Sequence, residues 1–144
     1  MITIYAGGKP HRYEFASLIA EFEQRLVKPY QIQWQFYDEA KLLQKLETWP
    51  FDAQRDFVIC CDERGRNLSS PELAQLMQEQ LQTAHNLVFL IGGAYGFPEA
   101  LRRRADLVWS FSRLVFPHQL ARLILSEQIY RAQEIAKGSK YHHE

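Results

Sequence analysis

The sequence has few cysteines, and their placement excludes several classes of protein. Among the 144 residues there are 2 cysteines, adjacent at Cys60 and Cys61. Adjacent cysteines fit neither a disulfide framework nor the Cys-x-x-Cys spacing of zinc and redox sites. We therefore predict no metal site, and a reducing cytoplasm is the expected location.

Long apolar runs and an excess of one charge are also missing. No run approaches the roughly 18 apolar residues of a membrane-spanning helix, and Met1–Tyr5 does not resemble a signal peptide, so we expect no membrane partner. The 17 basic and 17 acidic side chains leave a net charge of zero. A general nucleic-acid binder usually carries a basic excess, so neutrality counts against that class. It leaves open an enzyme that docks on one structured RNA through a local basic patch. The Arg102–Arg104 run is more often a solvated helix face than an RNA contact.

What the sequence does contain is an alternation of strands and helices within one domain, residues 1–144. Hydrophobic residues make up 47% and charged residues 24%, the balance of a globular protein. Apolar runs and helical periodicities alternate along the chain, which predicts an α/β fold with a mostly parallel sheet. We expect strands over 1–5, 31–36, 57–61, 87–91 and 107–111, helices over 11–28, 42–46, 70–81, 98–104 and 117–137, and a turn at 62–65.

Three segments follow predicted strands, and ligands of parallel sheets bind at such carboxyl ends. They are residues 61–65, 92–96 and 111–116. The glycines of 92–96 have neither dinucleotide-binding nor P-loop spacing. A loop lined by backbone and lacking phosphate-binding residues suits S-adenosylmethionine, although a plain turn is the commoner explanation of paired glycines. Segment 111–116 is either a strand end packed on the core or an apolar wall for an adenine ring.

Three short motifs occur in a fixed order in the last third of the chain. They are Ile91–Gly96, Ser110–His118, and Glu127–Ala132 followed by Tyr141-His142. Together with Gly8-Lys9 and with Gly65 followed by Ser69-Ser70, this arrangement resembles the RlmH-type methyltransferases of the SPOUT superfamily. The resemblance implies an α/β trefoil knot in the C-terminal half. It also implies S-adenosylmethionine-dependent methylation of N3 of a pseudouridine in 23S ribosomal RNA of the large subunit.

The resemblance also implies site residues and partners. Tyr141 and His142 match the catalytic tail of the family, with Arg131 holding RNA, and the substrate would be ribosomal RNA in assembled ribosomes. Family members are homodimers in which the tail of one subunit completes the site of the other. The cofactor-binding residues implied are Cys61, Gly92, Gly93, Gly96, Phe111, Ser112, Arg113, Leu114, Val115 and Phe116. We expect Gly92→Val to abolish cofactor binding, because a branched side chain would intrude where backbone meets ligand.

Simpler explanations exist for several of these residues. Glu127 and Arg131 can pair across one helical turn, and His118 can serve as a helix cap. A short C-terminal tail usually frays, so we expect its removal to leave stability nearly intact.

The alternative function is a catalytically lapsed RNA- or nucleotide-binding module of the same fold. Two departures from the family pattern bear on it: Cys61 stands where leucine is common, and Val115 replaces a frequent threonine. Val115 and the neutral charge favour this alternative slightly. A small redox or hydrolytic enzyme is disfavoured, because no activated cysteine, Ser-His-Asp order or metal cluster is visible.

Overall fold

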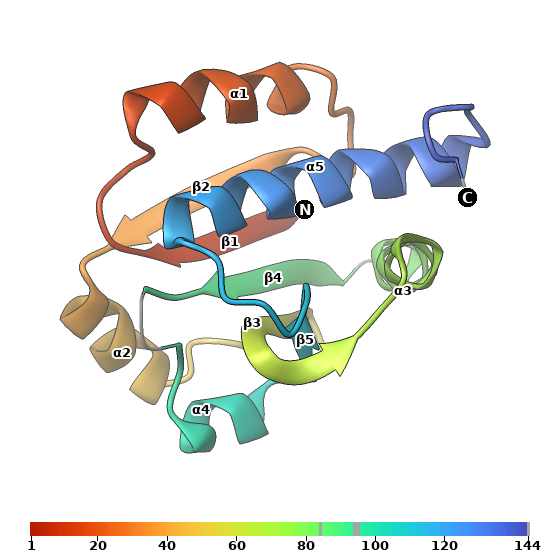
Figure 1. The fold of residues 1–144 in the computed structure, drawn as a ribbon. Coiled ribbons are helices and arrows are strands. Elements are labelled where there is room, and N and C mark those ends of the chain that lie inside the picture. Colours follow the sequence, from red (N-terminus) through yellow and green to blue (C-terminus); the bar gives the residue numbers. More distant parts are fainter. Residues whose placement is uncertain (84, 94–95, 144) are drawn as a thin grey trace.

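A single parallel sheet organises the chain. The computed structural model describes residues 1–83, 85–93 and 96–143, and within them five strands pair in the order β2-β1-β4-β3-β5. All neighbouring strands run parallel, which confirms the predicted α/β architecture (Figure 1). The strands are β1 (Ile2–Gly7), β2 (Ile32–Tyr37), β3 (Asp56–Asn67), β4 (Asn86–Ile91) and β5 (Leu107–Ser110).

Helices cover both faces of the sheet. One face carries three helices, α1, α3 and α5, and α5 packs between the other two (Figure 1). The opposite face carries α2 and α4, whose apolar side chains join a second, smaller core. The helices are α1 (Tyr13–Glu23), α2 (Glu39–Glu47), α3 (Ser70–Gln82), α4 (Glu99–Arg104) and α5 (His118–Lys137).

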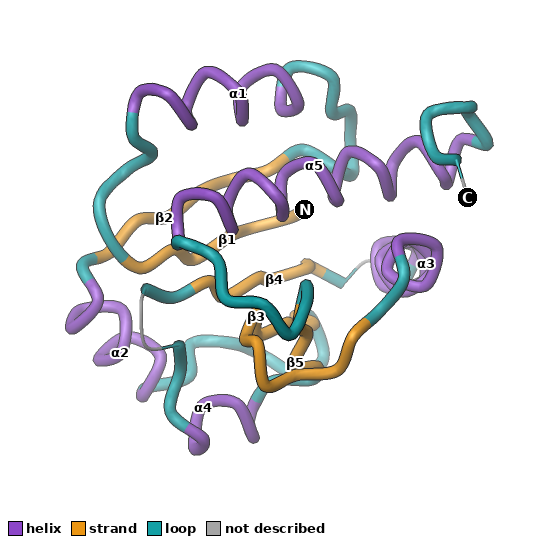
Figure 2. Tube along the Cα trace, viewed as in Figure 1, coloured by secondary structure: helices purple, strands orange, loops and turns teal. Residues whose placement is uncertain are grey.

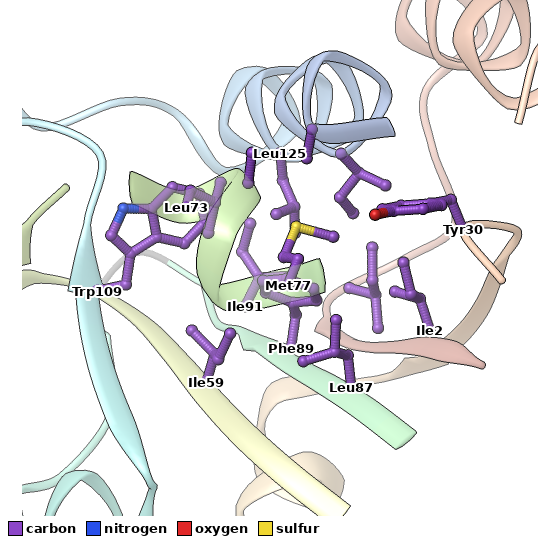
Figure 3. Close-up of a cluster of buried hydrophobic side chains, with 14 of the residues drawn as sticks. Ile2, Tyr30, Ile59, Leu73, Met77, Leu87, Phe89, Ile91, Trp109 and Leu125 are labelled. Atoms are coloured by element: carbon purple, nitrogen blue, oxygen red, sulfur yellow. The ribbon is translucent and has the colours of Figure 1, made fainter. Parts of the chain in front are cut away.

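The central strand β4 shows why its sequence is apolar throughout. Leu87, Phe89 and Ile91 face α3 and α5, where they meet Met77 and Leu125 (Figure 3). The alternate residues of β4 point into the smaller core under α2 and α4. A strand of a parallel sheet is buried on both faces, so neither set of side chains can be polar.

Helix ends follow the residues that the sequence places there. Ser69 accepts the amide of Glu72 at 3.2 Å, and the Glu72 carboxylate accepts the amide of Ser69 at 2.9 Å, a complete capping box at the start of α3. Gly138 ends α5 in the left-handed conformation with φ 72°. Residues next to the helix ends thus set both of these ends.

The predicted helix over 11–28 is too long. Helix α1 ends at Glu23, and Leu26 lies in the main core outside any helix. Pro29 disfavours a helical conformation in the residue before it. The buried amide of Gln133 on α5 bonds the irregular segment twice, accepting from the amide of Val27 at 2.8 Å and donating to the carbonyl of Arg25 at 3.1 Å. The first bond satisfies an amide that a longer helix would have paired, and the second satisfies a carbonyl that a longer helix would have directed at Pro29, which has no N–H.

The predicted turn at 62–65 is also wrong, because β3 continues through it to Asn67. The pairing with β5 shifts register there: Cys61 and Arg66 both lie opposite Trp109. The intervening residues form an irregularity that bends the strand, visible as the curl of β3 in Figure 1. Strand β5 ends at Ser110, one residue before the predicted end.

Gly65 is the residue that lets β3 bend this closely against β5. A Cβ atom there would lie 2.5 Å from the carbonyl carbon of Val108, a backbone atom that cannot move aside alone. We therefore expect Gly65→Ala to lower the free energy of unfolding by about 3 kcal/mol, as overpacking does. Gly138→Ala is the control: it meets nothing within 4 Å, and only its left-handed backbone costs roughly 1 kcal/mol. Urea denaturation measures both, and equal losses would contradict the steric explanation.

Candidate functional site

A cavity of about 670 Å³ opens at the carboxyl edge of the sheet, where the strand-end segments converge. This volume lies within the range of small-molecule sites. All three segments singled out from the sequence contribute to it. The lining residues are Cys61, Asp62, Glu63, Arg64, Ile91, Gly92, Gly93, Gly96, Trp109, Phe111, Ser112, Leu114, Val115, Phe116, Pro117, His118 and Ala121.

The structure brings together nine of the ten residues proposed for the cofactor. The exception is Arg113, which is exposed and is not among the lining residues. Ala94 and Tyr95 of the glycine motif lie outside the described residues. The sequence prediction missed the aromatic floor from Trp109, the charged side chains after Cys61 and the first turn of α5. Segment 61–65 was recognised as a strand end, and its charged residues were the available indication.

Gly92, Gly93 and Gly96 line the cavity with backbone. A Cβ atom at any of these positions would point at a neighbouring residue of the protein. A Cβ on Gly92 would lie 3.2 Å from the Phe97 ring, and one on Gly93 would collide with the carboxylate of Glu39. Gly96 has φ 68° and would place its Cβ 2.7 Å from Asp62. A valine at position 92 would therefore press on Phe97, and its effect on cofactor binding stays a prediction.

Figure 2 shows the loop, drawn in teal, that joins β5 to α5. Its apolar residues form one wall of the cavity. Leu114 and Val115 are 69% and 73% exposed, unusual values for side chains of this size. Two serines hold the irregular backbone: Ser110 donates its hydroxyl to the carbonyl of Ser112 at 2.7 Å, and Ser112 accepts the amide of Leu114 at 3.0 Å. Side chain to backbone bonds thus shape the exposed part of this wall, and Phe111 at its start packs on the main core.

A buried carboxylate supplies the strongest electrostatic feature of the cavity. The Asp62 side chain is 1% exposed and accepts the Arg64 amide and Nε, both at 2.9 Å, and Arg64 Nη2 at 2.8 Å. It also accepts the amide of Phe97 at 3.3 Å. Burial alone raises the pKa of Asp62, but the bonds from Arg64 and Phe97 outweigh it and lower the pKa to about 2. Asp62 is therefore a fixed negative charge at neutral pH.

The pKa of the neighbouring thiol shifts in the opposite direction. Burial raises the pKa of Cys61 well above the ordinary value, and the charge of nearby Asp62 adds to the shift. Cys61 stays a neutral thiol with no nucleophilic role.

Helix α5 reaches the cavity through its first turn. Its N-cap, Pro117, has no side-chain cap bond, so the expected capping role of His118 is wrong and the imidazole lines the cavity instead. One turn later the buried Arg122 donates to the carbonyl of Gly7 at 2.9 Å and to that of Lys9 at 2.8 Å. Arg122 thereby fixes the backbone after β1 against α5.

The tail residues gather at the opposite end of α5. Arg131 pairs with Glu127 at 2.6 Å, lies 4.8 Å from the centre of the Tyr141 ring and is 3.0 Å from His142 Nδ1. The Tyr141 hydroxyl donates to Glu127 at 3.3 Å. Tyr141 and His142 are half-buried, which argues against the simpler explanation of a frayed tail. The predicted i,i+4 pair is real, and it forms the base of a four-residue cluster, hereafter the tail cluster: Glu127, Arg131, Tyr141 and His142.

The cavity and the tail cluster are far apart within one chain. Arg131 lies 13 residues after His118 on α5, which is about 20 Å along a helix. Figure 1 shows the C-terminus beyond the end of α5 that is remote from its first turn. The two sets of predicted site residues therefore do not meet in a single subunit.

Within the part of the chain that the structure describes, no helix is both long and apolar enough to cross a membrane. No group of three or more His, Cys, Asp or Glu side chains within residues 1–83, 85–93 and 96–143 is arranged to hold a metal ion.

The arrangement of sheet and helices has a counterpart among solved structures. A probable methylase family protein from Haemophilus influenzae superposes with a TM-score of 0.60 over 99% of this chain and 70% of its own. The two sequences are 11% identical, so the likeness concerns the fold. The chain thus has an α/β fold that this solved protein shares.

Sequence comparison defines the family within this class. The model of the family described as predicted SPOUT methyltransferase matches residues 1–142. A protein of Caldicellulosiruptor bescii named ribosomal RNA large subunit methyltransferase H is 36% identical over 99% of both chains. The protein of that name from Christiangramia forsetii is 32% identical over 99% of this chain and 98% of its own. This chain belongs to the SPOUT methyltransferase family.

The depressed pKa of Asp62 makes a prediction about acid stability. A carboxylate whose pKa falls from the ordinary 3.8 to about 2 on folding stabilises the protein above pH 4. That stabilisation, about 2 kcal/mol, is lost as the pH falls from about 4 to about 2. Asp62→Asn should therefore be less stable than wild type at pH 6, and the gap should close toward pH 2. Denaturant titrations at both pH values test this, and an unchanged gap would show that Asp62 is not held as a carboxylate.

Proposed function

We propose that the protein methylates N3 of a pseudouridine in 23S ribosomal RNA, with S-adenosylmethionine as methyl donor. The observation that carries this proposal is the convergence of the three strand-end segments on one cavity of small-molecule size. Relatives named ribosomal RNA large subunit methyltransferase H, alignable over almost the whole chain, support the choice of substrate.

The composition of the cavity fits S-adenosylmethionine. Apolar side chains of Leu114, Val115 and Phe116 offer a surface for a purine ring, and exposed backbone at the glycines offers donors and acceptors for its edge. The carboxylate of Glu63, also among the lining residues, suits the amino group of an amino-acid moiety. When bound, the cofactor supplies an electrophilic methyl group. The role of the protein is then to orient the RNA base and to exclude water.

The tail cluster is proposed to act on the base. The imide N3 of pseudouridine must lose its proton, and we assign orientation of the base or removal of this proton to Tyr141 and His142. Burial raises the pKa of Tyr141, and the charge of Glu127 raises it further. Tyr141 therefore stays protonated, and while it donates to Glu127 its hydroxyl oxygen can orient the base by accepting a hydrogen bond. Arg131, held by Glu127, is placed to contact the RNA backbone.

The distance between the cavity and the tail cluster bears on how many subunits are needed to complete one site. One subunit cannot bring its own Tyr141 and His142 to its own cavity without dismantling α5. We therefore propose a homodimer in which the tail cluster of each subunit completes the cavity of the other. The trefoil knot of the C-terminal half stays a prediction from the family resemblance. The proposed location is the cytoplasm, with assembled ribosomes as the partner.

Cofactor binding is tested by obstructing the cavity from a rigid element. Ala121 lines the cavity on α5, so Ala121→Phe should weaken S-adenosylmethionine binding at least tenfold by occupying the space of the ligand. Ala20→Phe, an exposed position on α1, is the matched control and should bind normally. Isothermal titration calorimetry gives both affinities. Wild-type affinity in a folded Ala121→Phe protein would show that the cofactor binds elsewhere, and wild-type binding without methyl transfer would favour the lapsed module.

The shared site is tested by mixing two inactive variants. Chains carrying Tyr141→Ala and His142→Ala should be inactive, and so should Ala121→Phe chains, when methylation of pseudouridine in ribosomes is assayed. Refolded together, they form mixed dimers in which one of the two sites has an intact cavity and an intact tail. Random mixing gives mixed dimers in about half of the population, so activity should return to roughly a quarter of wild type.

The control for this experiment is each variant refolded alone, which should remain inactive. Sedimentation should show a dimer at micromolar concentration for all of the samples. A monomer of 17.0 kDa, or mixtures as inactive as their parents, would exclude a tail that works across the subunit boundary.

A further inference from the structure

The bend in β3 brings charged side chains to the glycine segment of the cavity. Between Cys61 and Arg66 the strand leaves its register with β5, and the residues in between are free of the ladder. Bulges of this kind redirect side chains next to functional sites. Asp62 and Arg64 lie in this stretch and reach across to Phe97, which follows β4.

Phe97 is held at both of its backbone groups. Its amide donates to Asp62 Oδ2 at 3.3 Å, and its carbonyl accepts from Arg64 Nη2 at 3.0 Å. The same Nη2 also donates to Asp62 Oδ2 at 2.8 Å, so the carboxylate and the guanidinium fix each other. The two side chains therefore hold both backbone polar groups of Phe97, an arrangement that we call the Asp62–Arg64 clamp.

The clamp acts at two positions of the glycine wall, by which we mean Gly92, Gly93 and Gly96. The Phe97 ring lies against Gly92, since a Cβ built there would be 3.2 Å from the ring. Gly96 approaches Asp62 so closely that its Cβ would lie 2.7 Å from Oδ2. The amide of Gly96 also donates to the carbonyl of Gly93 at 3.3 Å. Position 92 is thus set by the ring of Phe97, and position 96 by the carboxylate beneath it.

We propose that Asp62 and Arg64 are positioning residues that hold the glycine wall in its ligand-binding shape. They act on the cofactor through Phe97 and not by contact with the reacting atoms. This inference rests on the proposed function, because the ligand of the wall is taken to be S-adenosylmethionine. Loss of the clamp releases the wall, so the ligand must order the wall again when it binds.

Arg64→Lys is the most informative variant, because it keeps the positive charge and removes the planar guanidinium with its several N–H donors. Arg64 is 47% exposed, so the lysine protein should fold. A lysine cannot hold the carboxylate and the Phe97 carbonyl with the same planar geometry. We expect the Kd and the KM for S-adenosylmethionine to rise about tenfold, with kcat on ribosomes unchanged at saturating cofactor. The Phe97 amide should exchange with deuterium about tenfold faster in the absence of ligand.

Two further variants separate this role from general stability. Arg55→Lys changes an arginine whose Nε pairs with Asp52 at 3.2 Å on the surface, and it should alter none of these quantities. Asp62→Asn should weaken cofactor binding in the same direction as Arg64→Lys. If Asp62→Asn does not fold, Arg64→Lys alone decides the proposal.

The outcomes distinguish this inference from the proposed function. A wild-type protein that does not bind S-adenosylmethionine would overturn the proposed function and the clamp's role with it. A wild type that binds, beside an Arg64→Lys protein of equal affinity, would overturn the clamp alone. Weaker binding with unchanged exchange of the Phe97 amide would also overturn it, because Arg64 would then contact the ligand directly. Weaker binding together with faster exchange supports it.

Discussion

The parallel direction of all five strands is the constraint from which the site follows. Parallel pairing sends every carboxyl end to one edge, and the order β2-β1-β4-β3-β5 sets β4 between β1 and β3 at its centre. The bend within β3 and the segments after β4 and β5 therefore meet, although 50 residues separate Cys61 from Phe111. None of the three segments identifies a binding site by its own sequence. The sheet places all three around one cavity.

Arg122 fixes the remaining side of this edge. A guanidinium that is 1% exposed is costly to bury unless its donors are satisfied, and here backbone carbonyls of Gly7 and Lys9 accept them. Burial lowers the pKa of Arg122, yet an arginine remains charged at any physiological pH. The end of β1 is thus joined to the helix that forms the cavity rim, and sheet and helix cannot shift independently there.

Element types were predictable from the sequence, and their ends were less so. Strand β4 is apolar at every position after Asn86, and the Ser69–Glu72 box marks the start of α3, so local residues suffice for both. The end of α1 depends on Gln133, more than a hundred residues away, and no local pattern reveals such a bond. The continuation of β3 through Asp62–Gly65 likewise depends on pairing with Trp109. The glycine and apolar segments were found because their local sequence marks them. The Asp62–Arg64 clamp and the first turn of α5 were not found, because their places in the site depend on long-range contacts.

Trp109 has a consequence for how the protein can be observed. Its indole is 3% exposed, lies between Phe89 and Phe111, and forms part of the cavity floor. An occupant of the cavity changes the polarity beside this ring, whereas Trp34 and Trp49 lie outside the lining residues. The chain therefore contains its own optical reporter, and its ultraviolet emission registers the filling of the cavity without an attached dye.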